Sequence, residues 1–358
     1  MEHRFETQCP VADTEYDALL LLSFGGPDKP EDVIPFLENV LRGRNVPRER
    51  MLAVAEHYYH FGGKSPINEQ NLALIDALRH ELDANGLARM PIYFGNRNWH
   101  PLLTDTMAQM AADGVKRALC LITSSFSSYS GCRQYRENLA AAREAIGPSA
   151  PIVHKLRVWY NHPLFIEAMA DRVREAMATL PAELRDDSLI VFSAHSIPNA
   201  QAETSRYVAQ LEESCRLVSA AVGGHAHELV YQSRSGSPHQ PWLEPDIGDF
   251  IRQRTAAGHH EALVVSPIGF VSDHMEVMFD LDEEAQQICA EHGIVMARAA
   301  TPGTHPSFVR MLRLLVEERL QENPLRLAVG EYGPSHDVCP EDCCPAMKLA
   351  MMARSGAR

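Results

Sequence analysis

Short apolar runs that alternate with amphipathic stretches constrain the fold of this chain more than any other feature. Segments such as 162–180 and 307–321 repeat apolar residues at the period of an α-helix. Continuous apolar runs are typical of parallel strands that are covered on both faces, so the alternation predicts an α/β fold. The eight predicted strands lie at 18–26, 90–97, 117–125, 152–157, 188–196, 227–233, 261–269 and 294–299.

The eight strands divide into two sets of four, and the α/β pattern stops after residue 330. We therefore expect two lobes, each a four-stranded parallel sheet flanked by helices, at 17–160 and 161–330. The remaining residues are expected to form a flexible N-terminus at 1–16 and a cysteine-bearing C-terminal tail at 331–358.

Charge and hydropathy exclude two classes of partner. The net charge of -14 and the lack of a Lys/Arg run argue against a nucleic acid, whose phosphates need a positively charged face. No apolar run approaches the ~20 residues of an integral membrane segment, and residues 1–16 have neither a signal peptide's nor a transit peptide's composition. We therefore expect a cytoplasmic protein without structural disulfides, whose partner is a small molecule or a metal ion.

A histidine and a carboxylate stand out where predicted strands end, because ligands of open α/β sheets bind at the carboxyl ends of strands. His195 lies near the end of the run 188–196, and Glu276 follows the run 261–269. An imidazole and a carboxylate suit a divalent transition metal, and both accept protons. Because one His and one Glu leave most coordination positions open, the pair suits transient delivery of an ion to another ligand.

Glu276 also begins a series in which Asp280 and Glu284 follow at intervals of four residues. On an α-helix, consecutive members lie about 40° apart around the axis and roughly 6 Å apart along it. Such like charges repel unless cations neutralise them, so the series predicts a path for metal ions or protons. Two simpler interpretations stay open: a solvated helix face, and a capping box in which Asp273 caps the helix and Glu276 completes the box.

Seven motifs together resemble those of the ferrochelatase family, in family order and at family spacing over essentially the whole chain. The resemblance implies two Rossmann-like lobes with a porphyrin bound between them. It also implies a lyase that inserts ferrous iron, as a substrate, into a porphyrin in haem b biosynthesis. The motifs are LLSFGGP, HYYHFGGKSPINEQ, FGNRNWHP, SSFSSYSGCRQYREN, FSAHSIP, YQSRSGSPHQPWLEPD and PIGFVSDHMEVMFDLD.

The resemblance also implies roles for individual residues. His195 matches the family histidine, our candidate acceptor of the porphyrin's protons and transient iron contact. Glu276 matches the carboxylate that faces it across the macrocycle, so we expect the two from different lobes. Asp280 and Glu284 match the acidic path to the surface. The resemblance also implies contacts with the porphyrin and its propionates, at Ser65, His57, Tyr58 and Tyr135.

Within the family, the sequence looks closer to the branch of monoderm bacteria that uses coproporphyrin III. The four propionates of coproporphyrin III favour cationic groups at the rim of the site. In some members of this branch a tyrosine near the first strand contacts the iron, but this chain has Phe24 there. Protoporphyrin IX as substrate, another tetrapyrrole chelatase and a non-catalytic haem or metal carrier are alternative interpretations. The candidate cations are Arg42, Arg44 and Arg97.

The tail carries Cys339, Cys343 and Cys344, and three thiols do not complete a four-thiolate site. Many ferrochelatases hold a [2Fe-2S] cluster with one internal cysteine and three near the C-terminus, and the resemblance assigns the internal position to Cys132. The alternatives are a zinc ion held together with His336 and a disordered, redox-reactive tail.

Overall fold

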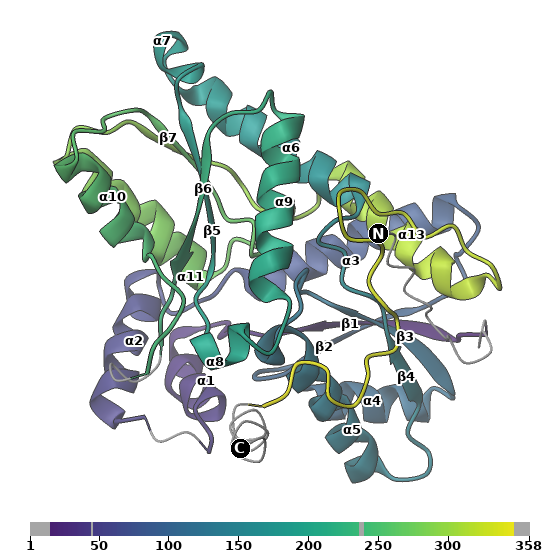
Figure 1. The fold of residues 1–358 in the computed structure, drawn as a ribbon. Helices are drawn as coiled ribbons and strands as arrows, with labels where there is room; N and C mark the ends of the chain where they lie inside the picture. Colours follow the sequence, from purple (N-terminus) through teal and green to yellow (C-terminus); the bar gives the residue numbers. More distant parts are fainter. Residues whose placement is uncertain (1–14, 44–45, 236–239, 347–358) are drawn as a thin grey trace, which may run out of the picture.

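The computed structural model describes residues 15–43, 46–235 and 240–346, which form two α/β lobes (Figure 1). Each predicted apolar run contains one strand, and each lobe contains one four-stranded parallel sheet, so the predicted fold class is confirmed. The strands are β1 Ala18–Ser23, β2 Ile92–Asn96, β3 Arg117–Ile122, β4 Ile152–Lys155, β5 Leu189–His195, β6 His227–Gln232, β7 Leu263–Ser266 and β8 Met296–Arg298.

The two sheets have the same strand order. It is β2-β1-β3-β4 in the first lobe and β6-β5-β7-β8 in the second, with every pairing parallel. In each sheet the chain passes to one side of the first strand and then returns to the other side. The topological switch points therefore lie between β1 and β3 and between β5 and β7, which is where open α/β sheets bind ligands.

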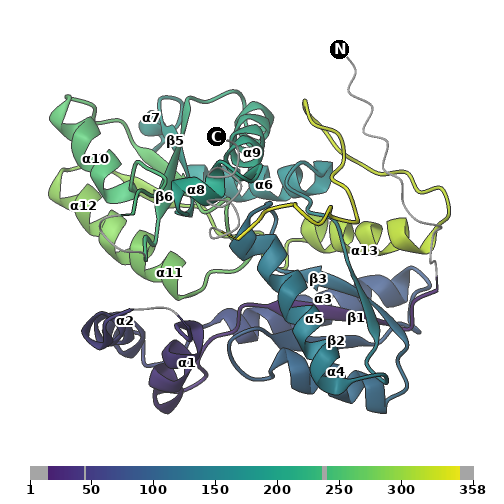
Figure 2. The same ribbon diagram turned by 60° about the horizontal axis from the view of Figure 1, so that its bottom comes forward.

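Helices cover both lobes, and α13 packs against α3 of the first lobe and α6 of the second (Figures 1 and 2). Phe308 and Met311 of α13 share one buried cluster with Leu78 of α3 and Met169 of α6. Buried apolar contacts therefore hold the lobes together on this side. The main helices are α1 Val33–Val40, α2 Arg48–His60, α3 Ile67–Ala84, α4 Leu103–Ala112, α5 Gln134–Ile146, α6 Pro163–Thr179, α9 Tyr207–Ala221, α10 Ile247–Ala256, α12 Gln286–Glu291 and α13 Pro306–Leu320.

The short helical segments are α7 Ala182–Arg185, α8 Asn199–Ala202, α11 Met275–Val277 and the 3-10 turn η1 Pro30–Asp32. Two further segments are π-helical: η2 Tyr129–Arg133, which leads into α5, and η3 Met278–Ala285, which joins α11 to α12. Single π-helical turns occur frequently at functional sites. The acidic series was expected on an α-helix, and this expectation is wrong, because Asp280 and Glu284 lie in η3.

The domain boundaries at 160 and 330 stay predictions. Residues 1–14 of the expected N-terminus and 347–358 of the expected tail lie outside the described residues. None of the helices in the described ranges combines the length and the apolar character that a bilayer-spanning helix needs.

Candidate functional site

His195 and Glu276 meet at the switch point of the second sheet. His195 ends β5, and Glu276 lies in α11, shortly after β7. Nε2 of His195 and Oε1 of Glu276 are 3.7 Å apart. The expectation that they come from different lobes is wrong, because β5 and β7 are neighbours in one sheet and their carboxyl ends share an edge. The 3.7 Å separation leaves no room for a macrocycle, so the pair can contact only one face of a flat ligand.

The His195 imidazole is oriented by its own backbone. Its Nδ1 lies 2.5 Å from the Ser196 carbonyl oxygen, which can only accept a hydrogen bond. Nδ1 therefore carries a proton, and Nε2 faces Glu276. Desolvation lowers the pKa of His195, but the Glu276 carboxylate outweighs it, and the net shift is upward.

A second imidazole supports Glu276 from the other side. Nδ1 of His274 accepts a hydrogen bond from the Glu276 amide at 3.2 Å and so caps α11. Asp273 is not the cap, because its Oδ1 binds Nη1 of Arg298 at 2.6 Å. Burial raises the pKa of Glu276, but the charges of His195 and His274 outweigh it and lower the pKa to about 2. The carboxylate is therefore ionised at neutral pH.

Sequence reasoning did not single out His274. Asp is a far commoner helix cap than His, so the capping pattern pointed to Asp273. The signal that would have found His274 is its place two residues before Glu276, in the segment between β7 and α11.

Asp280 lies behind Glu276 and is held by the end of β6. It accepts hydrogen bonds from Oγ of Ser233 and, at 3.2 Å, from Nε2 of Gln232. Ser233 has a φ of 61°, a left-handed conformation that is uncommon for a non-glycine residue. Desolvation and then the Glu276 and Glu284 charges raise the pKa of Asp280 to about 7. Glu284 is exposed, so the acidic series runs from the site to solvent.

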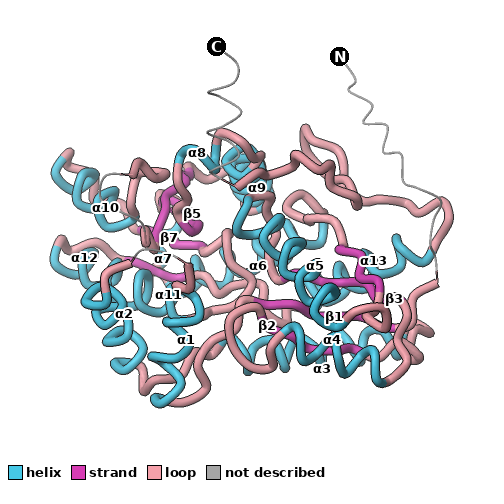
Figure 3. Tube along the Cα trace, turned by 90° about the horizontal axis from the view of Figure 1, so that it is seen from below, coloured by secondary structure: helices cyan, strands magenta, loops and turns pink. Residues whose placement is uncertain are grey.

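Helix α2 of the first lobe lies near α11 and α12 of the second lobe (Figures 2 and 3), and its side chains contact η3. The His57 ring stacks on Phe279, with centroids 3.8 Å apart and planes 12° apart. Nε2 of His60 lies 2.7 Å from Oε1 of Glu283. Burial, and then the Glu276 charge, raise the pKa of Tyr58 well above its ordinary value. Two of the predicted porphyrin contacts, His57 and Tyr58, therefore lie beside the acidic residues of the second lobe.

The other predicted porphyrin contacts lie in the first lobe. Ser65 is buried and packs so closely against Gly26 that an added Cβ there would lie 2.7 Å from the Ser65 Cβ. The Arg97 guanidinium lies 5.6 Å from the ring centroid of buried Tyr135 and 5.8 Å from that of Phe24. Of the remaining candidate cations, Arg42 lines a separate cavity of about 430 Å³, and Arg44 lies outside the described residues.

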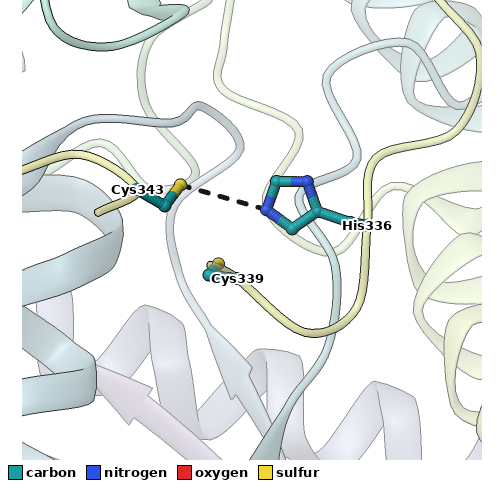
Figure 4. Close-up of side chains that lie close together, drawn as sticks. All are labelled: His336, Cys339 and Cys343. Atoms are coloured by element: carbon teal, nitrogen blue, oxygen red, sulfur yellow. Dashed lines mark hydrogen bonds between the residues drawn. The ribbon is translucent and has the colours of Figure 1, made fainter. Parts of the chain in front are cut away.

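The tail brings its cysteines to Cys132 in η2. The pKa of the Cys339 thiol is lowered by its interaction with Cys132 and, to a smaller extent, by its interaction with Cys343. The sulfur atoms of Cys343 and Cys344 are 3.7 Å apart. The ligand atoms of His336, Cys339 and Cys343 all lie within 4.8 Å of one another (Figure 4). Four thiols and one imidazole thus converge, and this donor set fits a four-thiolate iron-sulfur cluster as well as a zinc site.

The fold is similar to that of the sirohydrochlorin chelatase from Bacillus subtilis subspecies spizizenii in complex with cobalt. The TM-score is 0.50 at 11% identity, over 86% of this chain and 96% of that chain. This likeness concerns the fold alone.

Sequence comparison identifies the family. A model described as Ferrochelatase matches residues 16–320. The chain is 60% identical over 329 residues to the ferrochelatase of Rhodopirellula baltica, covering 92% of this chain and 93% of that protein. It is 52% identical over 353 residues to the coproporphyrin III ferrochelatase of Streptomyces coelicolor, covering 92% of this chain and 94% of that protein. The chain therefore belongs to the ferrochelatase family of lyases, which insert iron into porphyrins.

Proposed function

We propose that this chain inserts ferrous iron into coproporphyrin III and that His195 and Glu276 are its catalytic pair. The observation that supports the pair is its geometry, an imidazole nitrogen 3.7 Å from a carboxylate oxygen at a ligand-binding edge of the sheet. Family membership favours this activity over the carrier and the other tetrapyrrole chelatases considered above. A cytoplasmic location and a place in haem b biosynthesis are part of the proposal.

His195 is proposed as the base. A free-base porphyrin must lose its pyrrole N–H protons while iron enters, so a proton acceptor has to face the ring nitrogens. Nε2 of His195 is suited to this task because Nδ1 is occupied by the Ser196 carbonyl. The resulting imidazolium is stabilised by the ionised Glu276 carboxylate, which also offers the entering iron an oxygen ligand.

Asp280 and Glu284 are proposed as the exit for protons and the entry for iron. Because the pKa of Asp280 is about 7, its carboxyl both binds and releases a proton near neutral pH. His57, Tyr58, Ser65 and Tyr135 are proposed to hold the porphyrin, which would separate the stacked rings of His57 and Phe279 as it enters between the lobes.

The pH dependence of iron insertion tests the role of Asp280. Since its raised pKa keeps the carboxyl protonated below about pH 7, we expect the rate to rise between pH 6 and pH 8 as Asp280 ionises. Asp280→Asn should be slower, and its rate should rise less with pH, because only the contribution of His195 to the rise is left. A raised carboxyl pKa also means that ionisation destabilises the folded state, so Asp280→Asn should melt above wild type at pH 8, by an amount that shrinks toward pH 4. An unchanged pH profile in the variant would contradict the role.

The identity of the porphyrin is tested by comparing kcat/KM for coproporphyrin III and protoporphyrin IX. We expect at least a tenfold preference for coproporphyrin III, because a single charge-assisted hydrogen bond to an extra propionate is worth about 1.5–3 kcal/mol. Several relatives at 49–52% identity are named coproporphyrin III ferrochelatase, whereas the 60% identical relative is named ferrochelatase alone. Equal or faster turnover of protoporphyrin IX would make that porphyrin the substrate.

We propose that Cys132, Cys339, Cys343 and Cys344 hold a [2Fe-2S] cluster. The convergence of four thiols supports the proposal. When bound, such a cluster supplies one-electron chemistry and ties the tail to the first lobe.

Cys339→Ser should therefore lose the visible absorbance, the iron and the acid-labile sulfide of the wild type. The matched control is Cys289→Ala, since Cys289 is buried in α12 with its sulfur 3.7 Å from that of Met296. This control should keep all three signals. Wild-type protein that contains zinc but no sulfide would support the alternative site with His336.

A further inference from the structure

A lysine of the first lobe lies among the tail cysteines, and neither the catalytic site nor the ligand set uses it. Lys155 ends β4 and is half-buried. Its side chain lines a cavity of about 670 Å³ beside η2 and the tail. The same cavity is lined by Cys132, Cys339, Cys343 and Cys344. The ammonium group of Lys155 interacts electrostatically with Cys132 and Cys339.

Carboxylates do not neutralise this ammonium group. Among the described residues, Lys155 has no ion pair with an acidic side chain, and its Nζ donates to the carbonyl oxygen of Leu156 at 3.2 Å. The carboxylate of Asp337 interacts electrostatically with it. That carboxylate is engaged by Arg326 at 3.1 Å and by Arg319 at 3.8 Å. The groups that share the cavity with Lys155 and lie close to its charge therefore include the sulfur atoms of the cysteines.

The neighbouring arginines act differently. Nη1 of Arg133 donates to the carbonyl oxygens of Glu341 at 2.7 Å and Cys343 at 3.2 Å, and Arg136 donates to that of Pro340 at 3.4 Å. These two side chains hold the backbone of the tail loop in place. Lys155, in contrast, directs its charge at the thiols.

An uncompensated ammonium in a half-buried site is unfavourable, and so is a buried group of thiolates. An iron-sulfur cluster becomes more negative when it accepts an electron, and its reduction potential depends on nearby charges and on hydrogen bonds to its sulfurs. A fixed positive charge at this place stabilises the reduced form more than the oxidised form.

We propose that Lys155 is the counter-charge of the tail metal centre and raises its reduction potential. The inference rests on the proposed [2Fe-2S] cluster. It makes Lys155 a positioning residue, because the side chain acts on the cluster through its charge and is not itself an iron ligand.

The experiment compares wild type, Lys155→Met, Lys155→Arg and the surface control Lys116→Met, each as purified full-length protein. Iron and acid-labile sulfide are measured first. Midpoint potentials then come from titration with dithionite in the presence of redox mediators, followed by electron paramagnetic resonance. In Lys155→Met the ratio of reduced to oxidised cluster at a given potential should fall at least tenfold, which equals about 59 mV for a one-electron couple. Lys155→Arg and Lys116→Met should stay near wild type.

The outcomes separate this inference from the cluster proposal. Wild type without sulfide refutes the cluster and the inference together. If wild type contains sulfide but Lys155→Met has an unchanged reduction potential, the inference alone is refuted. If Lys155→Met loses its cluster, retention by Lys155→Arg supports the charge role, whereas loss in both variants contradicts it.

Melting temperatures give an independent readout. After removal of the metal, Lys155→Met should melt closer to wild type, because the negatively charged cluster that the Lys155 charge stabilises is gone. As purified, it should melt below wild type. A variant that melts below wild type equally in both states would show that Lys155 only supports packing.

Discussion

Replacing His195 with alanine is expected to lower the rate of iron insertion about a thousandfold, within the range attributed to general bases. The variant keeps the Glu276 carboxylate but has no group at the position of Nε2 to accept pyrrole protons. Porphyrin affinity should stay within a few-fold of wild type, because the proposed porphyrin contacts lie in other segments. The rate is measured anaerobically with ferrous iron as loss of free-base fluorescence, and the affinity by fluorescence quenching without iron.

The matched control is His80→Ala. His80 is an exposed histidine on α3, and its removal should leave both quantities unchanged. Near-normal turnover by His195→Ala would remove this residue from the role of base. A proportional loss of turnover and porphyrin affinity would assign His195 to binding instead.

The fold was predictable because parallel sheets covered on both faces leave a simple trace in the sequence. Each strand is a continuous apolar run, and β1, for example, is buried along its whole length. The place of His195 was predictable for a related reason. A polar residue that directly follows a buried strand lies at the carboxyl edge of the sheet, whatever the details of packing.

The arrangement around Glu276 was not predictable, since it depends on contacts between segments distant in sequence. Asp273 has the residue type and spacing of a helix cap, but Arg298 of β8 takes its carboxylate. That ion pair frees the capping position for His274. The expectation that the pair comes from different lobes failed because it followed the resemblance and not the boundary near 160, which both residues follow, with β5 beside β7.

The π-helix was also hidden from sequence reasoning. Residues 276, 280 and 284 have α-helical spacing, and no local propensity distinguishes a π-helical turn from an α-helical one. The end of β6 fixes Asp280 through Gln232 and Ser233, which again lie far away in sequence. The acidic residues could thus be identified from the sequence, but their individual electrostatics could not.

Replacing Glu276 with glutamine should reduce kcat about a hundredfold and also move the pH dependence. Glutamine keeps the shape of the side chain but removes the charge that is proposed to stabilise the His195 imidazolium and to receive the iron. The Glu276 carboxylate raises the pKa of both His195 and Asp280, so its loss lowers both pKa values, and the free imidazole and the ionised Asp280 persist to lower pH. The acid limb of the kcat/KM profile should therefore shift to lower pH while the maximum falls.

A purely structural role for Glu276 would lower activity without moving the acid limb, so the shift is the diagnostic measurement. Glu291→Gln is the matched control, since it removes an exposed carboxylate from α12 of the same lobe. It should change neither the rate nor the profile. If Glu276→Gln keeps the wild-type acid limb, the 3.7 Å contact does not couple the two side chains during turnover. Another group would then have to stabilise the protonated base. His274 is a neighbour of His195 and Glu276, but it cannot fill this role because an imidazole carries no negative charge.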